Sequence, residues 1–323
     1  MLIRYGTDGN GKLIKKANVY TSQEHLISNT NIDPDALQII HRLRDAGFTA
    51  YIVGGAVRDL IVGNKPKDFD IVTDATPSRI KRIFRNSRII GRRFRLVHVV
   101  FGSKIFEVST FRSNAEGSVG NEFGTIDEDV LRRDFSINAL YYDPISCQII
   151  DYVGGMRDIK KHILRPVIPL DRIFIEDPVR MLRAVKYSAT THAKIPFSLR
   201  HKIISSAVLL SQISPSRLTE ELLKIINSTS AYEIIKEALD TDLYIYLQPA
   251  ATALIYENKN FEKSYLENMK ALSELNRTQP DARMGKKLTY LIKDFVLSLT
   301  DWKKEAKDNP VFTEIYAKTW SDC

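Results

Sequence analysis

The spacing of apolar residues changes character near Arg165. Before this point, short apolar runs separated by glycine or Thr-Pro turns predict alternating strands and helices. After it, strand patterns stop, and apolar residues recur at helical spacing over 178–190, 198–210, 215–227, 231–239, 259–275 and 284–299. The sequence therefore predicts a small α/β head followed by an all-helical region, with the boundary near Pro166–Pro169.

Within the head, several short elements are predicted. The helices cover 33–46, 56–62, 76–84 and 133–140, and the strands cover 51–53, 69–72, 97–101, 105–111, 149–153 and 163–164. A stretch rich in Gly, Asn and acids at 113–129 predicts a mobile loop. We divide the chain into a mobile N-terminal segment (1–27), a head (28–168), a helical neck (169–230) and a helical body (231–323).

The charge balance of the chain is basic. Lys and Arg number 47 against 39 Asp and Glu, which gives a net charge of +8 and a pI near 9.2. This excess suits a polyanionic partner without requiring one. Two cysteines without a CxxC pair support neither a zinc site nor a disulfide framework. The polar N-terminus and the absence of an apolar run of roughly 20 residues predict a cytoplasmic protein without membrane contact.

Asp68-Phe69-Asp70 places two carboxylates at a predicted strand. Residues i and i+2 of a strand point to the same face, so both carboxylates should project together while Phe69 packs behind them. Like charges this close are unfavourable unless a cation joins them, and Mg²⁺ commonly binds one or two carboxylates plus substrate phosphates. Two such ions about 3.5–4 Å apart stabilise the attacking and leaving oxygens of nucleotidyl transfer. A D-x-D alone also occurs by chance at the ends of surface strands.

Two neighbouring features strengthen the interpretation as a metal site. Gly54-Gly55 precedes Arg58 at a strand-to-helix turn, where glycine lets backbone N–H groups approach a phosphate and arginine adds a charged fork. A plain tight turn with a surface arginine would give the same pattern. The strands predicted at 97–101 and 105–111 flank Gly102-Ser103 and form a predicted hairpin. Glu107 stands among apolar residues of the second of these strands, and a carboxylate there needs a partner. It is either a third metal-site carboxylate or an edge-strand acid, and its place after the D-x-D strand favours the first.

Five motifs in order resemble the class II nucleotidyltransferase superfamily, which holds the bacterial poly(A) polymerases and the tRNA CCA-adding enzymes. They are G-G-A-V-R-D (54–59), K-P-K-D-F-D (65–70), E-V-S-T-F-R (107–112), R-R-D-F-S-I-N-A-L (132–140) and E-D-P-V-R-M-L-R-A (176–184). The resemblance runs from about residue 48 to residue 225. It implies a polymerase-β-like head, with a small mixed sheet and helices, followed by an all-α neck and body.

The resemblance also implies roles for single residues. The implied catalytic residues are Asp68, Asp70, Glu107 and Asp134, with Asp68 and Asp70 as ligands of two Mg²⁺ ions. The implied nucleotide-binding residues are Gly54, Gly55, Arg58, Arg133, Asp177, Arg180, Arg183 and Lys186. Of these, Gly55 and Arg58 match positions that hold the triphosphate, and Arg133 matches one near the ribose.

The resemblance assigns base recognition to the helix that contains Asp177 and Arg180. These two residues are three apart, so both can share one helix face. A guanidinium donates to a ring nitrogen while a carboxylate accepts from an exocyclic amine, and adenine and cytosine both offer that pair. Locally, Asp177-Pro178 is also a good N-cap, or Asp177 and Arg180 form an intrahelical ion pair. The stretch 213–217 with Glu221 resembles a later motif that braces this helix.

The two subfamilies share these motifs, and four further features resemble the bacterial poly(A) polymerases. They are the segment 89–98, the approach to the R-R-D motif at 121–129, Tyr141-Tyr142 and the S-P-S-R form of the later motif. The Y-x-D-x-R-x-P loop of many CCA-adding enzymes is absent. Two features depart from the bacterial poly(A) polymerases. The loop at 113–129 is shorter than in the best-known members, and this sequence lacks a long basic C-terminal extension of the kind expected to help hold RNA.

The predicted function is one-step addition of AMP from ATP to an RNA 3′ end, with two Mg²⁺ ions and release of pyrophosphate. A tRNA CCA- or A-adding enzyme is the alternative. A non-catalytic RNA-binding relative would have lost a carboxylate that this chain retains. A D-x-D glycosyltransferase would need a longer alternating βα pattern before the acidic pair. The basic residues between 81 and 95 fit either a solvated face or contact with the triphosphate or RNA.

Overall fold

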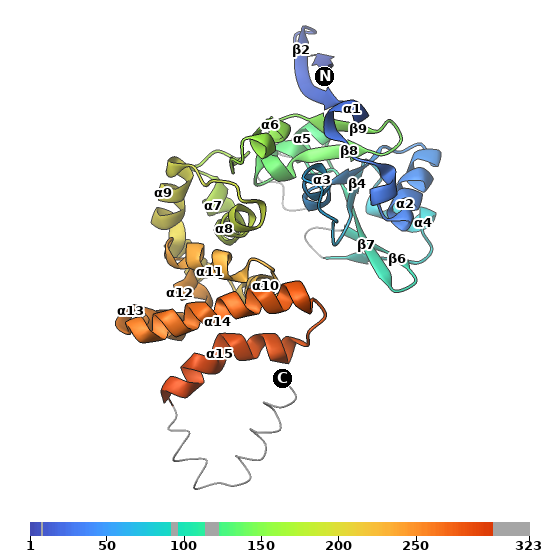
Figure 1. Ribbon diagram of the computed structural model, residues 1–323. Helices are drawn as coiled ribbons and strands as arrows, with labels where there is room; N and C mark the ends of the chain where they lie inside the picture. Colours follow the sequence, from blue (N-terminus) through green and yellow to red (C-terminus); the bar gives the residue numbers. More distant parts are fainter. Residues whose placement is uncertain (8, 92–95, 114–122, 300–323) are drawn as a thin grey trace. The chain divides into compact units, whose positions relative to one another are not determined.

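The computed structural model describes residues 1–7, 9–91, 96–113 and 123–299 of the chain (Figure 1). The chain divides into two compact units, Met1–Ile173 and Phe174–Cys323. The predicted change from an α/β head to a helical region is confirmed, and the finer division of the helical region into neck and body stays a prediction. Parts of the predicted loop 113–129 and of the segment 89–98 lie outside the described residues.

A nine-stranded mixed sheet forms the centre of the first unit, in the order β1-β2-β9-β8-β3-β4-β7-β6-β5. The strands are β1 (Leu2–Thr7), β2 (Leu13–Tyr20), β3 (Ala50–Val53), β4 (Asp70–Thr73), β5 (Ser87–Ile90), β6 (Leu96–Phe101), β7 (Lys104–Thr110), β8 (Leu140–Asp143) and β9 (Gln148–Asp151). Among these described strands, β4 and β7 are parallel, and the other neighbours are antiparallel. The mixed sheet that the resemblance implied is therefore confirmed.

Helices of the first unit pack against this sheet. They are α1 (Ser22–His25), η1 (Asn29–Asn31), α2 (Pro34–Asp45), α3 (Gly55–Ile61), α4 (Pro77–Ile83), α5 (Ile126–Leu131), η2 (Ser136–Asn138) and α6 (Gly155–Lys160). The larger apolar cluster joins α2, α3 and α4 to one sheet face that includes Ile52 and Ile71. A smaller cluster covers the opposite face with Tyr51, Val53 and Val72. Because β3 is buried on both faces, its sequence is a continuous apolar run and does not alternate.

The prediction of a mobile segment at 1–27 is wrong. β1 and β2 pair as an antiparallel hairpin, and β2 extends the sheet by pairing with β9. Ala17 and Val19 alternate into the core while the residues between them stay more exposed, which fixes the register of β2. The Gly-rich stretch 9–11 between the strands is a hairpin signal. The prediction missed it because it rested on the polar composition of residues 1–27 and not on the turn between two strands.

The prediction of a helix at 133–140 is also wrong. A single 3-10 turn, η2, stands there instead and leads directly into β8, where Tyr142 lies opposite Ile52 of β3. Only Leu140 of this stretch belongs to a strand, where it pairs with Asp151 of β9, and the apolar spacing alone did not distinguish a helix from a turn followed by a strand.

Three smaller differences concern the rest of the head. Among the described strands, none covers the predicted strand at 163–164, and the strand predicted at 149–153 is β9, which pairs with β8 and β2. The short edge strand β5 was not predicted. Within the predicted loop at 113–129, α5 begins after a capping box in which Thr125 and Glu128 bond reciprocally. This S/T-x-x-E signature is local and was readable from the sequence.

The second unit is helical throughout its described part. Its helices, with the short α7 at the division, are α7 (Ile173–Glu176), α8 (Arg180–Thr191), α9 (Phe197–Ser206), η3 (Ala207–Gln212), α10 (Pro215–Ile226), α11 (Ala231–Leu239), α12 (Tyr244–Leu247), α13 (Pro249–Glu257), α14 (Lys259–Thr278) and α15 (Met284–Leu299). All six predicted helices are confirmed, while α7, α12 and α13 were not predicted. In the described part of the chain, none of the helices has the length and apolar character needed to span a membrane.

Candidate active site

The ends of β3 and β4 lie side by side and carry the acidic pair. Val53, the last residue of β3, is opposite Asp70, the first residue of β4. Phe69 is buried in the larger apolar cluster with Ile71, whereas Asp68 and Asp70 are exposed. The predicted alternation, with two exposed carboxylates in front of a buried phenylalanine, is therefore confirmed.

Gly54 connects this acidic pair to the R-R-D motif. Its φ of +73° and ψ of −135° belong to a region that side chains other than glycine rarely adopt. A Cβ on Gly54 would lie 3.9 Å from Asp70 Oδ2 and 3.9 Å from Arg133 Nη1. The structure thus brings together three predicted site residues from separate motifs around one glycine.

Arg58 is held inside the head by its neighbours. The residue is 8% exposed. Its Nη1 donates to Asn138 Oδ1 at 2.7 Å, and its Nε and Nη2 donate to Asp59 Oδ1 at 2.9 and 2.7 Å. Its Nη2 also lies 3.6 Å from where a Cβ of Gly55 would be. The alternative of a surface arginine is therefore excluded, and the guanidinium is fixed beside the glycine turn.

Arg133 is clamped between Asp129 and Tyr141. Its Nη2 donates to Asp129 Oδ2 at 2.9 Å, its Nε donates to the Tyr141 hydroxyl at 2.9 Å, and that hydroxyl donates to Asp129 Oδ2 at 2.7 Å. Burial alone would lower the pKa of the Arg133 guanidinium, but the neighbouring Tyr141 and Asp129 outweigh it and raise that pKa. Burial also raises the pKa of Tyr141. The site therefore keeps a permanent positive charge in a fixed orientation.

Sequence reasoning did not assign Asp129 or Tyr141 to this clamp. Asp129 lies four residues before Arg133, a spacing that suggests a pair, but it was placed in a loop. Tyr141 was noted as a subfamily feature and not as a partner of Arg133.

Asp134 is 5% exposed and stabilises the backbone around it. Its Oδ1 accepts from the N–H of Phe135 at 2.8 Å, and its main-chain carbonyl accepts from Val167. These contacts tie the R-R-D motif to the segment that follows α6. A catalytic role for Asp134 stays a prediction.

Glu107 lies on β7, next to β4 in the sheet. The parallel register pairs Ile71 with Val108, so Glu107 lies one position back, level with Asp70. Its Oε1 is 3.5 Å from His98 Nε2 across the hairpin, and its side chain is 55% exposed. Among the described residues, no three side chains of His, Cys, Asp or Glu form a group that could hold a metal ion. The third-carboxylate role of Glu107 therefore stays a prediction.

In the second unit, Asp177 lies three residues before Arg180, the first residue of α8. Its Oδ1 accepts from the N–H of Val179 at 3.2 Å. The predicted N-cap role of Asp177 is wrong, because the N-cap of α8 is Val179 and the helix starts two residues later than the Asp177-Pro178 pair predicted. The Asp177 Oδ2 accepts from Arg217 Nη2 at 2.8 Å. Arg180 Nη1 donates to Glu176 Oε2 at 3.0 Å. Asp177 and Arg180 therefore pair with different residues, and the predicted ion pair between them is wrong.

Helix α8 presents the remaining predicted cations on one partly exposed side. Arg183 donates to the Tyr187 hydroxyl at 3.2 and 3.1 Å. Lys186 Nζ lies 3.8 Å from Glu221 Oε2 of α10. Together with the bond from Arg217 to Asp177, this contact confirms that the motif around 213–217 and Glu221 braces α8.

Two family models match the chain in order. The Poly A polymerase head domain matches residues 50–165, and the probable RNA and SrmB-binding site of polymerase A matches residues 194–255. The chain is also 43% identical over 252 residues to Poly(A) polymerase I of Salmonella typhimurium. The chain belongs to the class II nucleotidyltransferase family. The resemblance drawn from the five motifs is thus confirmed.

The chain is also similar to CCA-adding enzymes. The CCA-adding enzyme of Lactobacillus helveticus is 36% identical over 214 residues, which is 64% of this chain and 53% of the relative. The crystal structure of the Bacillus stearothermophilus CCA-adding enzyme in complex with CTP is 33% identical, with a TM-score of 0.62. That match covers 75% of this chain and 58% of the other. The match to the Salmonella polymerase covers 73% of this chain and 54% of the relative, so the chain spans about half the length of these curated relatives.

Proposed function

We propose that the chain adds AMP from ATP to RNA 3′ ends without a template. The observation that carries this proposal is the meeting of Asp70, Gly54 and Arg133 at the ends of β3 and β4. A carboxylate, a glycine that leaves room for phosphate and a permanent cation are the groups that nucleotidyl transfer needs.

Magnesium fits the donor set at this edge. Asp68 and Asp70 offer exposed carboxylate oxygens, and Mg²⁺ is typically held by one or two carboxylates together with substrate phosphates and water. When bound, Mg²⁺ would neutralise charge on the triphosphate and stabilise the leaving pyrophosphate.

The protein residues position the reacting groups. Arg58 and Arg133 would hold the triphosphate and ribose, each in an orientation that its own hydrogen bonds fix. The RNA 3′ oxygen then forms a bond to the α-phosphorus of ATP, the bond from that phosphorus to the pyrophosphate oxygen breaks, and the 3′ hydroxyl proton passes to solvent or to a nearby carboxylate. No covalent enzyme intermediate is required.

We propose addition of AMP residues over addition of C-C-A because sequence identity to the two kinds of relative favours it. The poly(A) polymerase of Salmonella is 43% identical and the CCA-adding enzyme of L. helveticus is 36% identical to the chain. The four sequence features that resemble poly(A) polymerases lean the same way. CCA or A addition to tRNA is the second candidate, supported by the similarity to a CCA-adding enzyme structure.

One incubation separates the two candidates. The protein is given Mg²⁺, an unstructured RNA or a tRNA that lacks its 3′ end, and ATP alone or ATP with CTP. Long A tails on the unstructured RNA support the proposal. A short C-C-A product confined to the tRNA would contradict it, as would activity that persists after EDTA removes the divalent ions.

The pair formed by Arg217 and Asp177 should tune base selection. If Asp177 accepts from the exocyclic amine of the base, its orientation depends on the 2.8 Å bond from Arg217. We expect Arg217→Ala to lower the preference for ATP over GTP by about two- to fivefold, because an exposed ion pair contributes up to about 1 kcal/mol. Competition between ATP and GTP in single-nucleotide addition measures this ratio. An unchanged ratio would remove Arg217 from base selection.

The first helix of the region that matches the RNA-binding model carries an exposed aromatic stack. Phe197 of α9 is 85% exposed and stacks on His201, with ring centroids 6.3 Å apart and planes at 18°. Helix α9 itself carries Arg200, His201 and Lys202 and no acid, and Arg200 pairs with Glu237 of α11. Stacking on bases combined with cationic surroundings is typical of single-stranded nucleic acid binding.

We therefore expect Phe197→Ala to weaken RNA binding by about tenfold. Tyr256→Ala is a matched control, because Tyr256 is 61% exposed but lies near Asp240 and Asp242. Titration of a labelled A-rich RNA by fluorescence anisotropy measures both variants. Equal losses in the two variants, or none in Phe197→Ala, would show that the stack does not contact RNA.

A further inference from the structure

The turn η2 contacts both arginines of the candidate site. Asn138 accepts from Arg58 Nη1 through its side chain at 2.7 Å. Its main-chain carbonyl accepts from Arg133 Nη1 at 3.4 Å. Asn138 is 6% exposed, so it is enclosed together with the groups that it holds. The position of this turn therefore sets the position of two cationic groups at once.

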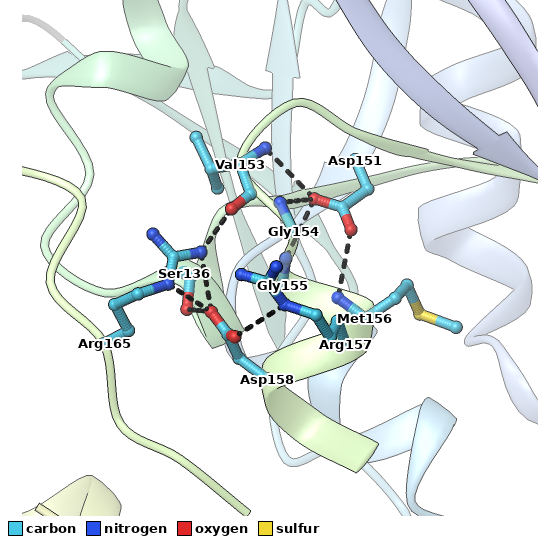
Figure 2. Close-up of polar contacts among 9 residues, drawn as sticks. All are labelled: Ser136, Asp151, Val153, Gly154, Gly155, Met156, Arg157, Asp158 and Arg165. Atoms are coloured by element: carbon cyan, nitrogen blue, oxygen red, sulfur yellow. Dashed lines mark hydrogen bonds and ion pairs between the residues drawn. The ribbon is translucent and has the colours of Figure 1, made fainter. Parts of the chain in front are cut away.

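Helix α6 packs directly behind this turn. A Cβ on Gly155 would lie 2.2 Å from the carbonyl oxygen of Ser136 and 3.1 Å from Leu140 Cδ2, so only glycine permits the contact. Asp158, one turn further along α6, accepts from the Ser136 hydroxyl at 2.6 Å (Figure 2). Ser136 is fully buried and Asp158 is 3% exposed.

Asp158 is itself fixed by an arginine. Arg165 Nε donates to Asp158 Oδ2 at 2.7 Å, and Arg165 Nη2 also bonds the carbonyl of Val153 (Figure 2). The main-chain carbonyl of Arg165 accepts from the N–H of Ser136 at 2.9 Å. Arg165 thus touches the turn through its backbone and the carboxylate through its side chain.

The start of α6 is fixed by a second buried carboxylate. Asp151, at the end of β9, accepts from the N–H groups of Val153, Gly154 and Gly155 at 3.2, 2.7 and 2.9 Å through Oδ1 (Figure 2). Its Oδ2 accepts from Met156 at 3.1 Å. The helix that carries Asp158 is therefore anchored to the central sheet and gives Asp158 a rigid base.

We infer that Asp158 is a positioning residue that orients Arg58 and Arg133 for the triphosphate by holding Ser136. The polar chain runs from Asp158 to Ser136, through the turn to Asn138, and from Asn138 to the two guanidinium groups. Asp158 does not touch the substrate, and its effect reaches the site through η2. The inference rests on the proposed binding of ATP at these arginines.

Three variants test the chain of contacts. Ser136→Ala removes the hydroxyl and leaves the pair between Asp158 and Arg165 intact. Asp158→Ala removes the acceptor, whereas Asp158→Asn retains one acceptor oxygen for Ser136. Ser87→Ala is the matched control, because its buried hydroxyl also makes a 2.6 Å hydrogen bond, to the Phe84 carbonyl at the far edge of the sheet.

The main readout is the dissociation constant for ATP with Mg²⁺ and without RNA, measured by calorimetry. We expect Ser136→Ala to weaken ATP binding about 3- to 10-fold, because one hydrogen bond contributes about 0.5–1.5 kcal/mol. Asp158→Asn should bind ATP more tightly than Asp158→Ala because it retains an acceptor for Ser136, and Ser87→Ala should bind ATP like the unaltered protein. The double variant Ser136→Ala/Asp158→Ala should bind no more weakly than Asp158→Ala alone, because both act through one contact. If Asp158→Ala does not fold, Ser136→Ala still decides.

Hydrogen exchange of the 133–140 peptide separates this inference from the proposed function. Faster exchange in Ser136→Ala but not in Ser87→Ala supports the brace, even if the unaltered protein does not bind ATP and the proposed function fails. Unchanged exchange overturns the inference. Unchanged ATP affinity in Ser136→Ala, when the unaltered protein binds ATP, overturns it as well. So does an equal loss of affinity in Ser87→Ala, which would indicate general destabilisation.

Discussion

Replacement of Asp70 by asparagine is expected to lower the rate of nucleotide addition by about a thousandfold or more. The substitution retains the size of the side chain and removes the negative charge that Mg²⁺ needs at the end of β4. Loss of several kcal/mol of transition-state stabilisation corresponds to at least this factor. Single-turnover extension of an end-labelled RNA measures the rate.

Asp45→Asn provides the control for this experiment. Asp45 is an exposed acid in the same unit, at the end of α2, and its loss changes the net charge by the same amount. Its variant should extend RNA at the normal rate. Because Asp70 is exposed and Phe69 carries the packing, the Asp70 variant should also melt at the normal temperature. An Asp70→Asn protein that kept its full rate would refute the metal-dependent mechanism.

The second large effect is expected from Gly54→Ala. A φ of +73° with a ψ of −135° is strained for alanine, and such strain costs about 1–3 kcal/mol of unfolding free energy. The new methyl group would also stand 3.9 Å from both Asp70 Oδ2 and Arg133 Nη1, where the triphosphate is proposed to lie. A displacement of about 1 Å in a reacting group can cost about a hundredfold in rate, so kcat/KM for ATP should fall by that order.

Gly63→Ala separates backbone strain from crowding. Gly63 has a similar φ of +79°, but no atom lies within 4 Å of the position that its Cβ would take. Both variants should melt at a lower temperature, whereas loss of kcat/KM should be confined to Gly54→Ala. If the two variants lose activity in proportion to stability alone, Gly54 has no part in substrate binding.

Local periodicity made the centre of this site predictable. In Asp68-Phe69-Asp70 the two aspartates are exposed and the phenylalanine between them is buried, because adjacent residues of an extended chain point to opposite faces and residues two apart point to the same face. The glycine turn after β3 is also a local signal, since Gly54 needs a positive φ whatever surrounds it. For these reasons the acidic edge and the turn beside it were readable before any tertiary structure was known.

The partners of the charged residues were not predictable in this way. Arg58 bonds Asn138, which is 80 residues away along the chain, and Asp177 bonds Arg217, which is 40 residues away. Such pairs follow from how the strands and helices assemble, and no local pattern encodes them. The prediction of a helix at 133–140 failed for the same reason, because the turn η2 in this stretch is held by the distant residues Asp158 and Arg165 through Ser136.

The place of the N-terminal hairpin has a consequence for synthesis of the protein. β2 pairs with β9, with Asn18 opposite Asp151, so β2 leaves the ribosome well before the strand with which it pairs. At about 5–20 residues per second, this delay lasts on the order of ten seconds. During it, the edge of β2 that will meet β9 is open to other chains. A nascent head is therefore most vulnerable to aggregation before Asp151 emerges, and slower translation of that stretch would prolong the exposure.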